Sequence, residues 1–272
     1  FTDFRECLAK TSCDAVVIAT NDGSHADIAI PALEKKKFVF VEKPLDITAE
    51  RCRALIRADR RAGGRTFVGF NLRYAPVYSA IHRLICEGRI GRVLTIEANE
   101  YYDGGRTYFR RWNRLRSMGG GLWITKASHD FDLLYWMAGE KPASVCAHDR
   151  LSYYRPCPSA ALYCRDCRYR KDCPDRYERS VPKGSHADQF RMITEEATGV
   201  KADLCLYNSK KDTFDHGTAL VQFPGGAIAS YTCNVVASFT NRQMRVSGTE
   251  GCLEGDLHLG ETLCDGRLER DP

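Results

Sequence analysis

The 272-residue chain contains no run of apolar residues approaching the roughly 20 that a membrane-spanning helix requires. We therefore expect no membrane partner. Internal repeats and low-complexity segments are also absent, which argues against a solenoid and against a largely disordered chain. Hydrophobic residues make up 43% of the chain and charged residues 28%, as is typical of globular proteins with a substantial core.

No long segment is strongly basic or strongly acidic. Lysine and arginine together number 40 and aspartate and glutamate 35, so the net charge of +5 is small and is spread along the chain. Nucleic-acid-binding modules usually concentrate their basic residues in one stripe. We therefore expect no nucleic-acid partner, and the mild positive charge suits at most a small anionic ligand.

The first 72 residues alternate apolar runs with amphipathic helices. The apolar runs are Ala15–Ala19, Phe38–Val41 and Thr66–Phe70, and helices are expected between them over about 24–36 and 48–62. Such alternation is typical of parallel strands that are covered on both faces. It predicts an α/β fold that begins with part of a doubly wound, Rossmann-type parallel sheet.

The two helices have recognisable boundaries and inner faces. Ser24, followed three residues later by Asp27, is a capping-box-like start for the first helix. Cys52, Leu55 and Ile56 are expected on the inner face of the second.

The tripeptide Glu42-Lys43-Pro44 follows the second apolar run directly. It should therefore lie just beyond the carboxyl end of a buried parallel strand, the edge at which open α/β sheets bind ligands. The other interpretation is an ordinary strand end with a solvated ion pair and a turn proline. Position in the sequence does not decide between the two.

The pattern changes after Asn71. Pro76 begins a helix, and the later strand candidates alternate apolar and polar residues as half-buried strands do. They are Val93–Glu100, Val145–Asp149, Thr218–Phe223, Ala227–Val236 and Gln243–Ser247, with a hairpin at Pro224-Gly225-Gly226. This predicts an α+β domain over residues 73–272 whose largely antiparallel sheet is open on one face, after a first domain over 1–72.

A glycine-rich stretch, Gly119–Gly121, leads into a predicted helix that carries four polar residues near one face. These are Thr125, Lys126, His129 and Asp132. An imidazole between an ammonium and a carboxylate can act as a proton donor or acceptor near neutral pH. The alternative is a half-buried histidine whose hydrogen bonding is satisfied by Asp132.

Taken together, four motifs in this order resemble the Gfo/Idh/MocA family, the glucose–fructose oxidoreductase and inositol dehydrogenase-like proteins. The motifs are Ala19-Thr20 with His25, Glu42-Lys43-Pro44, Asn71-Leu72-Arg73-Tyr74, and the glycine-led helix with His129 and Asp132. The resemblance covers nearly the whole chain, including Gly248-Thr249-Glu250-Gly251.

The resemblance implies an NAD(P)-dependent oxidoreductase that acts on a sugar, a cyclitol or a related polyol, and it implies a homo-oligomer. It places Lys43 at the nicotinamide and the reacting hydroxyl, and it makes His129 the acid/base. A cofactor cleft would be lined by the set Thr20, Asn21, His25, Glu42, Lys43 and Arg73. The alternative is a catalytically inactive binding or regulatory relative.

Two departures from the family pattern stand out. The family usually has an aspartate four residues before the histidine and a glycine two before it, where this chain has Thr125 and Ala127. Lys126 is then expected to serve as a second cation or proton relay.

The second departure is that the Gly-x-Gly-x-x-Gly turn, which holds a pyrophosphate at a helix N-terminus, does not occur. We interpret the chain as a fragment that lacks the first strand, the glycine-rich loop and the first helix, and that is inactive by itself. The end, GRLERDP, also reads as cut before the sheet is complete.

Four of the thirteen cysteines form a cluster over residues 157–173, which we interpret as an insertion. Cys157, Cys164, Cys167 and Cys173 have the spacing Cys-x6-Cys-x2-Cys-x5-Cys in a polar loop. Four thiolates at this spacing favour a structural zinc site, with an iron–sulfur cluster and two disulfides as alternatives. The other nine cysteines are scattered singly, which is typical of a reducing compartment and predicts a cytoplasmic protein.

The segment from Tyr101 to Trp112 is rich in aromatic residues and arginine. It is a candidate substrate wall, because sugars stack on aromatic faces and arginine binds acidic groups. A solvated loop explains the composition equally well.

Overall fold

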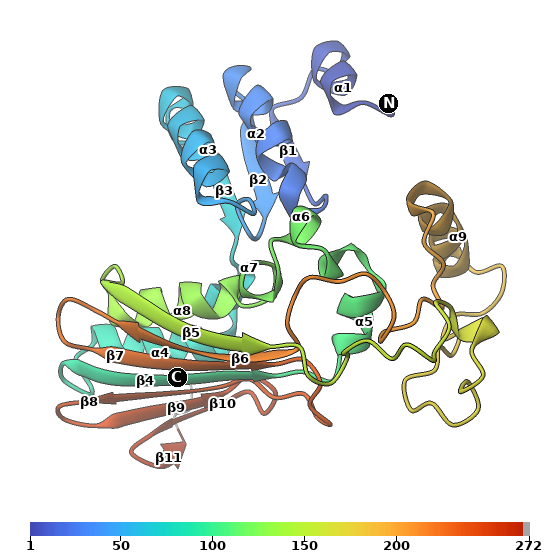
Figure 1. Ribbon diagram of the computed structural model, residues 1–272. Coiled ribbons are helices and arrows are strands. Elements are labelled where there is room, and N and C mark those ends of the chain that lie inside the picture. Colours follow the sequence, from blue (N-terminus) through green and yellow to red (C-terminus); the bar gives the residue numbers. More distant parts are fainter. Residues whose placement is uncertain (269–272) are drawn as a thin grey trace.

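Two separate β-sheets organise the computed structural model, which describes residues 1–268 (Figure 1). The first is a three-stranded parallel sheet in the order β1 (Ala15–Ile18), β2 (Phe38–Glu42) and β3 (Thr66–Gly69). Its helices are α1 (Phe4–Lys10), α2 (His25–Glu34) and α3 (Ala49–Ala62). The predicted alternation of parallel strands and helices is confirmed. Residues 269–272, which end the stretch GRLERDP, lie outside the described residues.

Helices α2 and α3 pack on one face of this sheet, around Ile18, Val39 and Leu55. The opposite face is exposed within the described residues, since Val17 is 73% and Phe67 49% accessible. The prediction that both faces are covered is therefore wrong for this chain. The runs are apolar on both sides of the strands, but helices of the described chain cover only one of those sides.

Local details of the two helices differ from expectation in two places. The Ser24 hydroxyl donates to the Asn21 carbonyl (2.8 Å) and makes no cap hydrogen bond to α2, which begins at His25. Ile56 is exposed, because α3 directs Leu55 and Ala58 into the core instead. The start of α3 is conventional, with the Thr48 side chain accepting from the Arg51 N–H.

The second sheet has eight strands in the order β11-β10-β9-β8-β4-β7-β6-β5. All neighbouring pairs are antiparallel except β4 with β7. The strands are β4 (Val93–Tyr101), β5 (Ser144–Arg150), β6 (His216–Gln222), β7 (Ile228–Asn234), β8 (Gln243–Gly248), β9 (Cys252–Asp256), β10 (Glu261–Cys264) and β11 (Arg267–Leu268). The largely antiparallel sheet and the β6–β7 hairpin are confirmed, whereas the sequence pattern did not reveal β9 to β11.

Two helices cover one face of this sheet, α4 (Pro76–Cys86) and α8 (Ser128–Ala138) (Figure 1). The core between helices and sheet contains Tyr78, Leu133 and Tyr231, each almost fully buried. The other face of the sheet is open.

Three short helices lie along the chain between β4 and α8. They are α5 (Gly105–Arg110), α6 (Arg116–Gly119) and α7 (Leu122–Thr125), and α6 contacts the single turn η1 (Asp22–Ser24) of the first domain. Segment 101–112, read as a substrate wall or a loop, thus contains α5.

The predicted continuous helix through Lys126 and His129 is wrong. α7 ends at Thr125 and α8 begins at Ser128. A continuous helix would offer the Thr125 carbonyl to the N–H four residues later, but this carbonyl accepts from Lys43 of the first domain.

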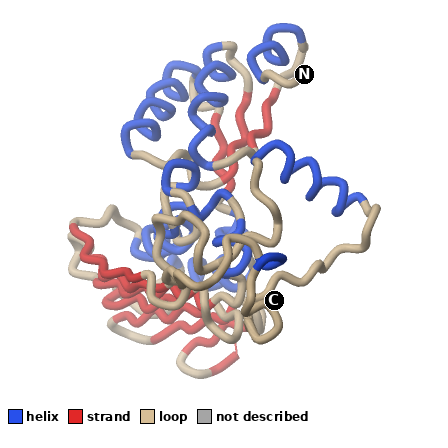
Figure 2. The backbone as a smooth tube through the Cα atoms, turned by 45° about the vertical axis from the view of Figure 1, so that its right-hand side comes forward, coloured by secondary structure: helices blue, strands red, loops and turns tan. Residues whose placement is uncertain are grey.

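The cysteine-rich segment is a loop with one short turn, η4 (Cys164–Asp166), and it leads to α9 (His186–Thr198). Figure 2 shows α9 extending to the right-hand side, and Figure 1 shows it apart from both sheets. Within residues 1–268 no helix combines the length and hydrophobicity needed to cross a bilayer.

Candidate active site

Lys43 joins the two domains. It follows β2 directly, as its position in the sequence predicted, and its Nζ donates to the Thr125 carbonyl oxygen at the end of α7 (2.6 Å). Burial lowers the pKa of Lys43, nearby Asp22 opposes this effect, and Lys126 adds to it. An ammonium is therefore held at the carboxyl edge of the parallel sheet, against the start of the second domain.

His25 supports the backbone beside Lys43. Its ring is fully buried, and Nδ1 donates to the Pro44 carbonyl (2.7 Å). The Lys43–Pro44 peptide bond is cis. His25 thus fixes the loop that presents Lys43 and is not itself accessible to a ligand.

The other predicted cofactor residues lie on the same rim. Thr20 is exposed, with its hydroxyl 2.7 Å from that of Ser24, and half-buried Asn21 precedes η1. Glu42 is half-buried at the end of β2, beside Gly69 of β3. The structure therefore brings Thr20, Asn21 and Glu42 to one sheet edge with Lys43.

His129 faces two cations and no carboxylate partner. Its buried Nδ1 has no hydrogen-bond partner among the described residues. Burial, together with the positive charges of Lys43 and Lys126, lowers the pKa of His129 to about 3. The imidazole is therefore neutral throughout the physiological pH range.

Asp132 does not satisfy His129, so this alternative interpretation is wrong. The carboxylate of Asp132 accepts two hydrogen bonds from Arg73, from Nε and Nη2, each 2.7 Å long. Arg73 also lies over the Trp136 ring (5.2 Å). The pair joins the segment after β3 to α8 and holds Arg73 on the second domain.

Lys126 belongs to a buried charge network that the sequence did not reveal. Its Nζ lies 2.6 Å from Glu100 Oε1 and 3.9 Å from the centre of the Tyr102 ring. Arg242 pairs with Glu100 and, at 3.1 Å, with Asp130. Two cations and two carboxylates therefore balance each other, and Lys126 is a fixed charge beside His129.

Asp22 is a further residue that sequence reasoning missed. It is 5% exposed, and burial raises its pKa to about 6, against the opposing effects of a Thr125 hydrogen bond and the Lys43 charge. No motif marks it, because η1 packs against α6 only in the folded chain.

The four predicted metal-binding cysteines line one cavity of about 310 Å³, together with Cys205. The bridge between Tyr163 and Leu204 brings Cys205 there. Within the part of the chain that the structure describes, no group of three or more His, Cys, Asp or Glu side chains is arranged as metal ligands. The four cysteines share this cavity, but a zinc site is not shown.

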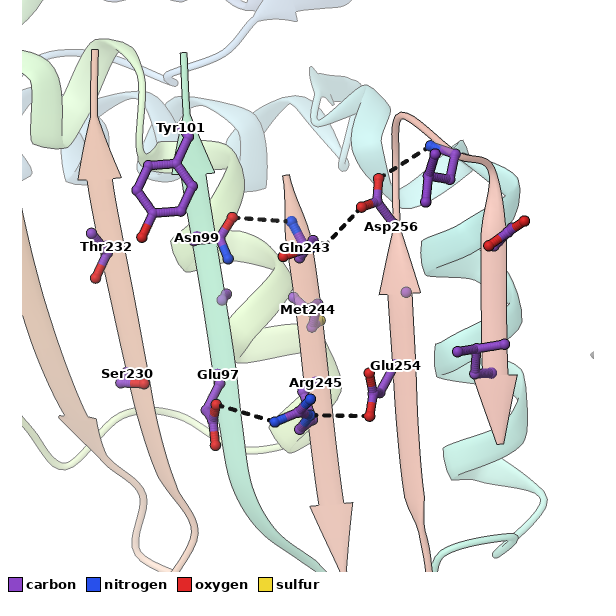
Figure 3. A pocket seen from close by; sticks show the side chains of 15 residues that line it. Glu97, Asn99, Tyr101, Ser230, Thr232, Gln243, Met244, Arg245, Glu254 and Asp256 are labelled. Atoms are coloured by element: carbon purple, nitrogen blue, oxygen red, sulfur yellow. Dashed lines mark hydrogen bonds and ion pairs between the residues drawn. The ribbon is translucent and has the colours of Figure 1, made fainter. Parts of the chain in front are cut away.

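A hollow of about 440 Å³ lies on the open face of the second sheet, across β4, β7, β8 and β9 (Figure 3). Arg245 spans its floor between Glu97 (4.0 Å) and Glu254 (3.2 Å). Figure 3 shows two hydrogen bonds from Gln243, whose backbone N–H donates to Asn99 Oδ1 (3.3 Å) and whose Nε2 donates to Asp256 Oδ2 (2.9 Å). None of the predicted catalytic residues lines this hollow.

A parallel sheet with polar side chains at its carboxyl edge, followed by an open-faced α/β domain, is the arrangement of a two-domain dinucleotide-dependent class of protein. Residues 1–70 match the family model described as "Oxidoreductase family, NAD-binding Rossmann fold". Residues 82–265 match "Oxidoreductase family, C-terminal alpha/beta domain". The chain therefore belongs to this oxidoreductase family, Gfo/Idh/MocA, and the sequence resemblance is confirmed.

Individual relatives agree with this assignment. The chain is 31% identical over 268 residues to the provisionally named oxidoreductase YteT of Bacillus subtilis, covering 93% of the chain and 62% of the relative. It is 36% identical over 225 residues to inositol 2-dehydrogenase of Rhizobium meliloti, covering 82% of the chain and 58% of the relative. The chain thus spans about 60% of these relatives' length.

A solved levoglucosan dehydrogenase, in complex with NADH and levoglucosan, shares the fold. Its TM-score to this chain is 0.73 at 20% identity, covering 97% of this chain and 60% of that one.

We predict that His129 remains neutral from about pH 5 to about pH 8, although a free imidazole protonates near 6.5. Its lowered pKa means that the folded protein protonates it only as the pH falls towards about 3. ¹⁵N NMR of the imidazole, assigned with His129→Gln, measures this. Lys126→Met should raise the His129 pKa, while the same change at exposed Lys141 should not. A titration midpoint between about 6 and 7 in the wild type would contradict the prediction.

Proposed function

We propose that the whole protein is an NAD(P)-dependent oxidoreductase that transfers a hydride between the nicotinamide and a CH–OH group of a sugar, cyclitol or related polyol. The observation that carries the proposal is the hydrogen bond from Lys43 Nζ to the Thr125 carbonyl (2.6 Å), which crosses between the domains four residues before His129. The Lys43 charge contributes to lowering the pKa of His129. The names of the relatives, inositol 2-dehydrogenase and levoglucosan dehydrogenase, support this substrate class.

The rim of the parallel sheet suits the cofactor. Thr20, Asn21, Glu42 and Lys43 lie on the edge where such sheets bind dinucleotides, and Arg73 is held nearby by Asp132. When bound, the nicotinamide supplies the hydride acceptor or donor. The levoglucosan dehydrogenase structure contains NADH, which favours NAD(H) over NADP(H).

His129 and Lys43 have different roles in the proposed reaction. A secondary alcohol can lose a hydride only if its O–H proton is taken up at the same time. The His129 imidazole is neutral, and this is the form that can accept that proton. The Lys43 ammonium stabilises the negative charge that develops on the substrate oxygen, and Lys126 contributes a fixed positive charge beside them.

Replacing either residue tests these roles. We expect Lys43→Ala and His129→Ala to lower kcat by a factor of about 10² to 10⁴ while NADH binding and the circular dichroism spectrum are retained. Exposed Lys10→Ala and His148→Ala serve as matched controls that should keep wild-type rates. The assay uses the complete open reading frame that encodes the chain, with myo-inositol and levoglucosan as substrates.

Wild-type turnover in either active-site variant would refute the assigned role. If the wild-type protein binds NADH but oxidises none of a broad panel of polyols, the alternative of an inactive binding or regulatory relative replaces the enzyme.

We also propose a homo-oligomer that forms through the open face of the second sheet. The face combines exposed Leu220 and Ile228 with the alternating charges of Glu97, Arg245 and Glu254, which a second copy can complement.

Light scattering coupled to gel filtration tests the oligomer. Arg245→Glu would place a third acidic residue between two others, so we expect the assembly to dissociate towards monomers. Arg57→Glu on exposed α3 is the control that should leave it intact. A wild-type protein that is monomeric at micromolar concentration would refute the proposal.

A structural zinc in the cysteine-rich segment remains a proposal as well. Its support is the shared cavity of the predicted cysteines with Cys205, and a backbone donor aimed at sulfur. The Tyr177 N–H donates to Cys164 Sγ (3.4 Å). Such donors stabilise thiolates.

Metal analysis of the purified protein tests this proposal. We expect about one zinc per chain, lost in Cys164→Ser and retained in Cys86→Ser, whose thiol lies outside the cavity. Iron in place of zinc would identify a cluster, and the absence of both metals would end the metal hypothesis.

We further propose that the domain boundary lies at residues 72/73, between the two sheets, with residues 157–173 as an insertion. We also propose a cytoplasmic location. All thirteen cysteines lie among the described residues as free thiols, which fits a reducing compartment. Cell fractionation that finds the protein outside the cytoplasm would refute the location.

A further inference from the structure

Asp175 is a buried carboxylate that lies just after the cysteine-rich segment. It is 2% exposed. Arg106 Nε donates to its Oδ1 (2.7 Å), and the Tyr207 hydroxyl donates to its Oδ2 (2.6 Å). The hydroxyls of Tyr153 and Tyr154 are also directed at it, at 3.4 and 3.5 Å. Burying a carboxylate is unfavourable unless it is hydrogen-bonded, and these donors meet that requirement.

Two arginines of α5 bind the chain next to the cysteine cavity. Arg106 and Arg110 are four residues apart and therefore lie on one face of this helix. Besides the bond from Arg106 to the Asp175 carboxylate, Arg110 Nη2 donates to the Asp175 carbonyl (2.6 Å) and its Nε to the Leu204 carbonyl (3.3 Å). Asp175 and Leu204 each lie within two residues of a cysteine that lines the cavity. Arginine hydrogen bonds thus join α5 to this segment at two separate points of the chain.

The helix α5 depends on such contacts for its position. It has only six residues and no side-chain cap at its start. Helices shorter than about 12 residues are not stable in water by themselves. Phe109 attaches α5 to the core, where its ring lies 4.9 Å from that of Tyr154. The hydrogen bonds of Arg106 and Arg110 to Asp175 add the second attachment.

The same helix reaches the candidate active site through Tyr108. The half-buried Tyr108 ring meets the Tyr102 ring edge to face, with 6.1 Å between their centres. Lys126 Nζ lies 3.9 Å from the centre of the Tyr102 ring and 5.8 Å from that of the Tyr108 ring. Lys126 directly follows Thr125, whose carbonyl accepts from Lys43. Through α5, the cysteine-rich segment is therefore connected to the surroundings of the proposed catalytic groups.

We infer that Asp175 is a positioning residue of the candidate active site: by binding two arginines of α5 it fixes this helix, and with it the Tyr108 ring beside Lys126. The cysteine-rich segment then supports the aromatic residues expected to contact the substrate. The inference deepens the proposed function and rests on it for its meaning in polyol binding. Its structural part, that Asp175 orders α5, is independent of turnover and of any metal at the cysteines.

The first test measures the order of α5 in the protein encoded by the complete open reading frame. We expect Asp175→Asn, which removes the charge and keeps the shape, to make amide hydrogen exchange in residues 105–110 about tenfold faster. Exchange is followed by mass spectrometry. Asp166→Asn removes the same charge from an exposed carboxylate of the cysteine-rich segment, and it should leave exchange in α5 unchanged.

A second variant covers the case in which Asp175→Asn does not fold. Arg106→Met removes the other member of the pair, and the Arg106 side chain is 47% exposed, so its loss does not open the core. It should accelerate exchange in α5 to a similar extent, whereas Arg155→Met, at an exposed arginine, should not. Unchanged exchange in α5 in both Asp175→Asn and Arg106→Met would overturn the inference.

Steady-state kinetics distinguish positioning from general stability. We expect Arg106→Met to raise the KM for myo-inositol or levoglucosan by about tenfold, while kcat and the dissociation constant for NADH change by less than about threefold. Because the effect acts through Tyr108, adding Arg106→Met to Tyr108→Ala should raise KM no further. An unchanged KM in Arg106→Met, or KM effects that multiply in the double variant, would refute the positioning role.

Failure of the proposed function gives a different result. In that case the wild-type protein turns over neither polyol, while hydrogen exchange in α5 still responds to Asp175→Asn and to Arg106→Met.

Discussion

The hydrogen bond from Lys43 Nζ to the Thr125 carbonyl is the interaction on which the rest of the site depends. It crosses from the edge of the parallel sheet to the start of the second domain, and it uses a carbonyl that becomes free because α7 ends there. The same contact brings an ammonium towards His129 and so contributes to keeping the imidazole neutral. The hydrogen bond that joins the two domains therefore also helps to keep His129 neutral.

Charge balance explains why a site with several cations is stable. Lys126 and Arg242 are matched by Glu100 and Asp130, and Arg73 is matched by Asp132. Burying such groups is costly, and removing one member would leave an unpaired buried charge, at a cost of about 3–5 kcal/mol. Lys43 is not a member of any of these ion pairs.

The sequence predicted those features that local pattern controls. Lys43 could be placed at a strand end because an apolar run leads directly to it, and the β6–β7 hairpin could be placed from its turn. The Glu100–Arg242 pair was not predictable, because it depends on the register of β4 against β8, about 140 residues apart along the chain. Cys205 likewise joins the cysteine cavity only through a bridge formed in three dimensions. The helix through Thr125 was predicted as continuous because periodicity does not reveal a carbonyl recruited by another domain.

A crystal structure of the complete protein with NADH and a bound polyol tests the central claim most directly. We expect the nicotinamide ring at the rim formed by Thr20, Asn21 and Lys43. The reacting carbinol should lie within hydrogen-bonding distance of both Lys43 Nζ and a ring nitrogen of His129. A cofactor bound away from this rim, or a carbinol that contacts neither Lys43 nor His129, would contradict the claim.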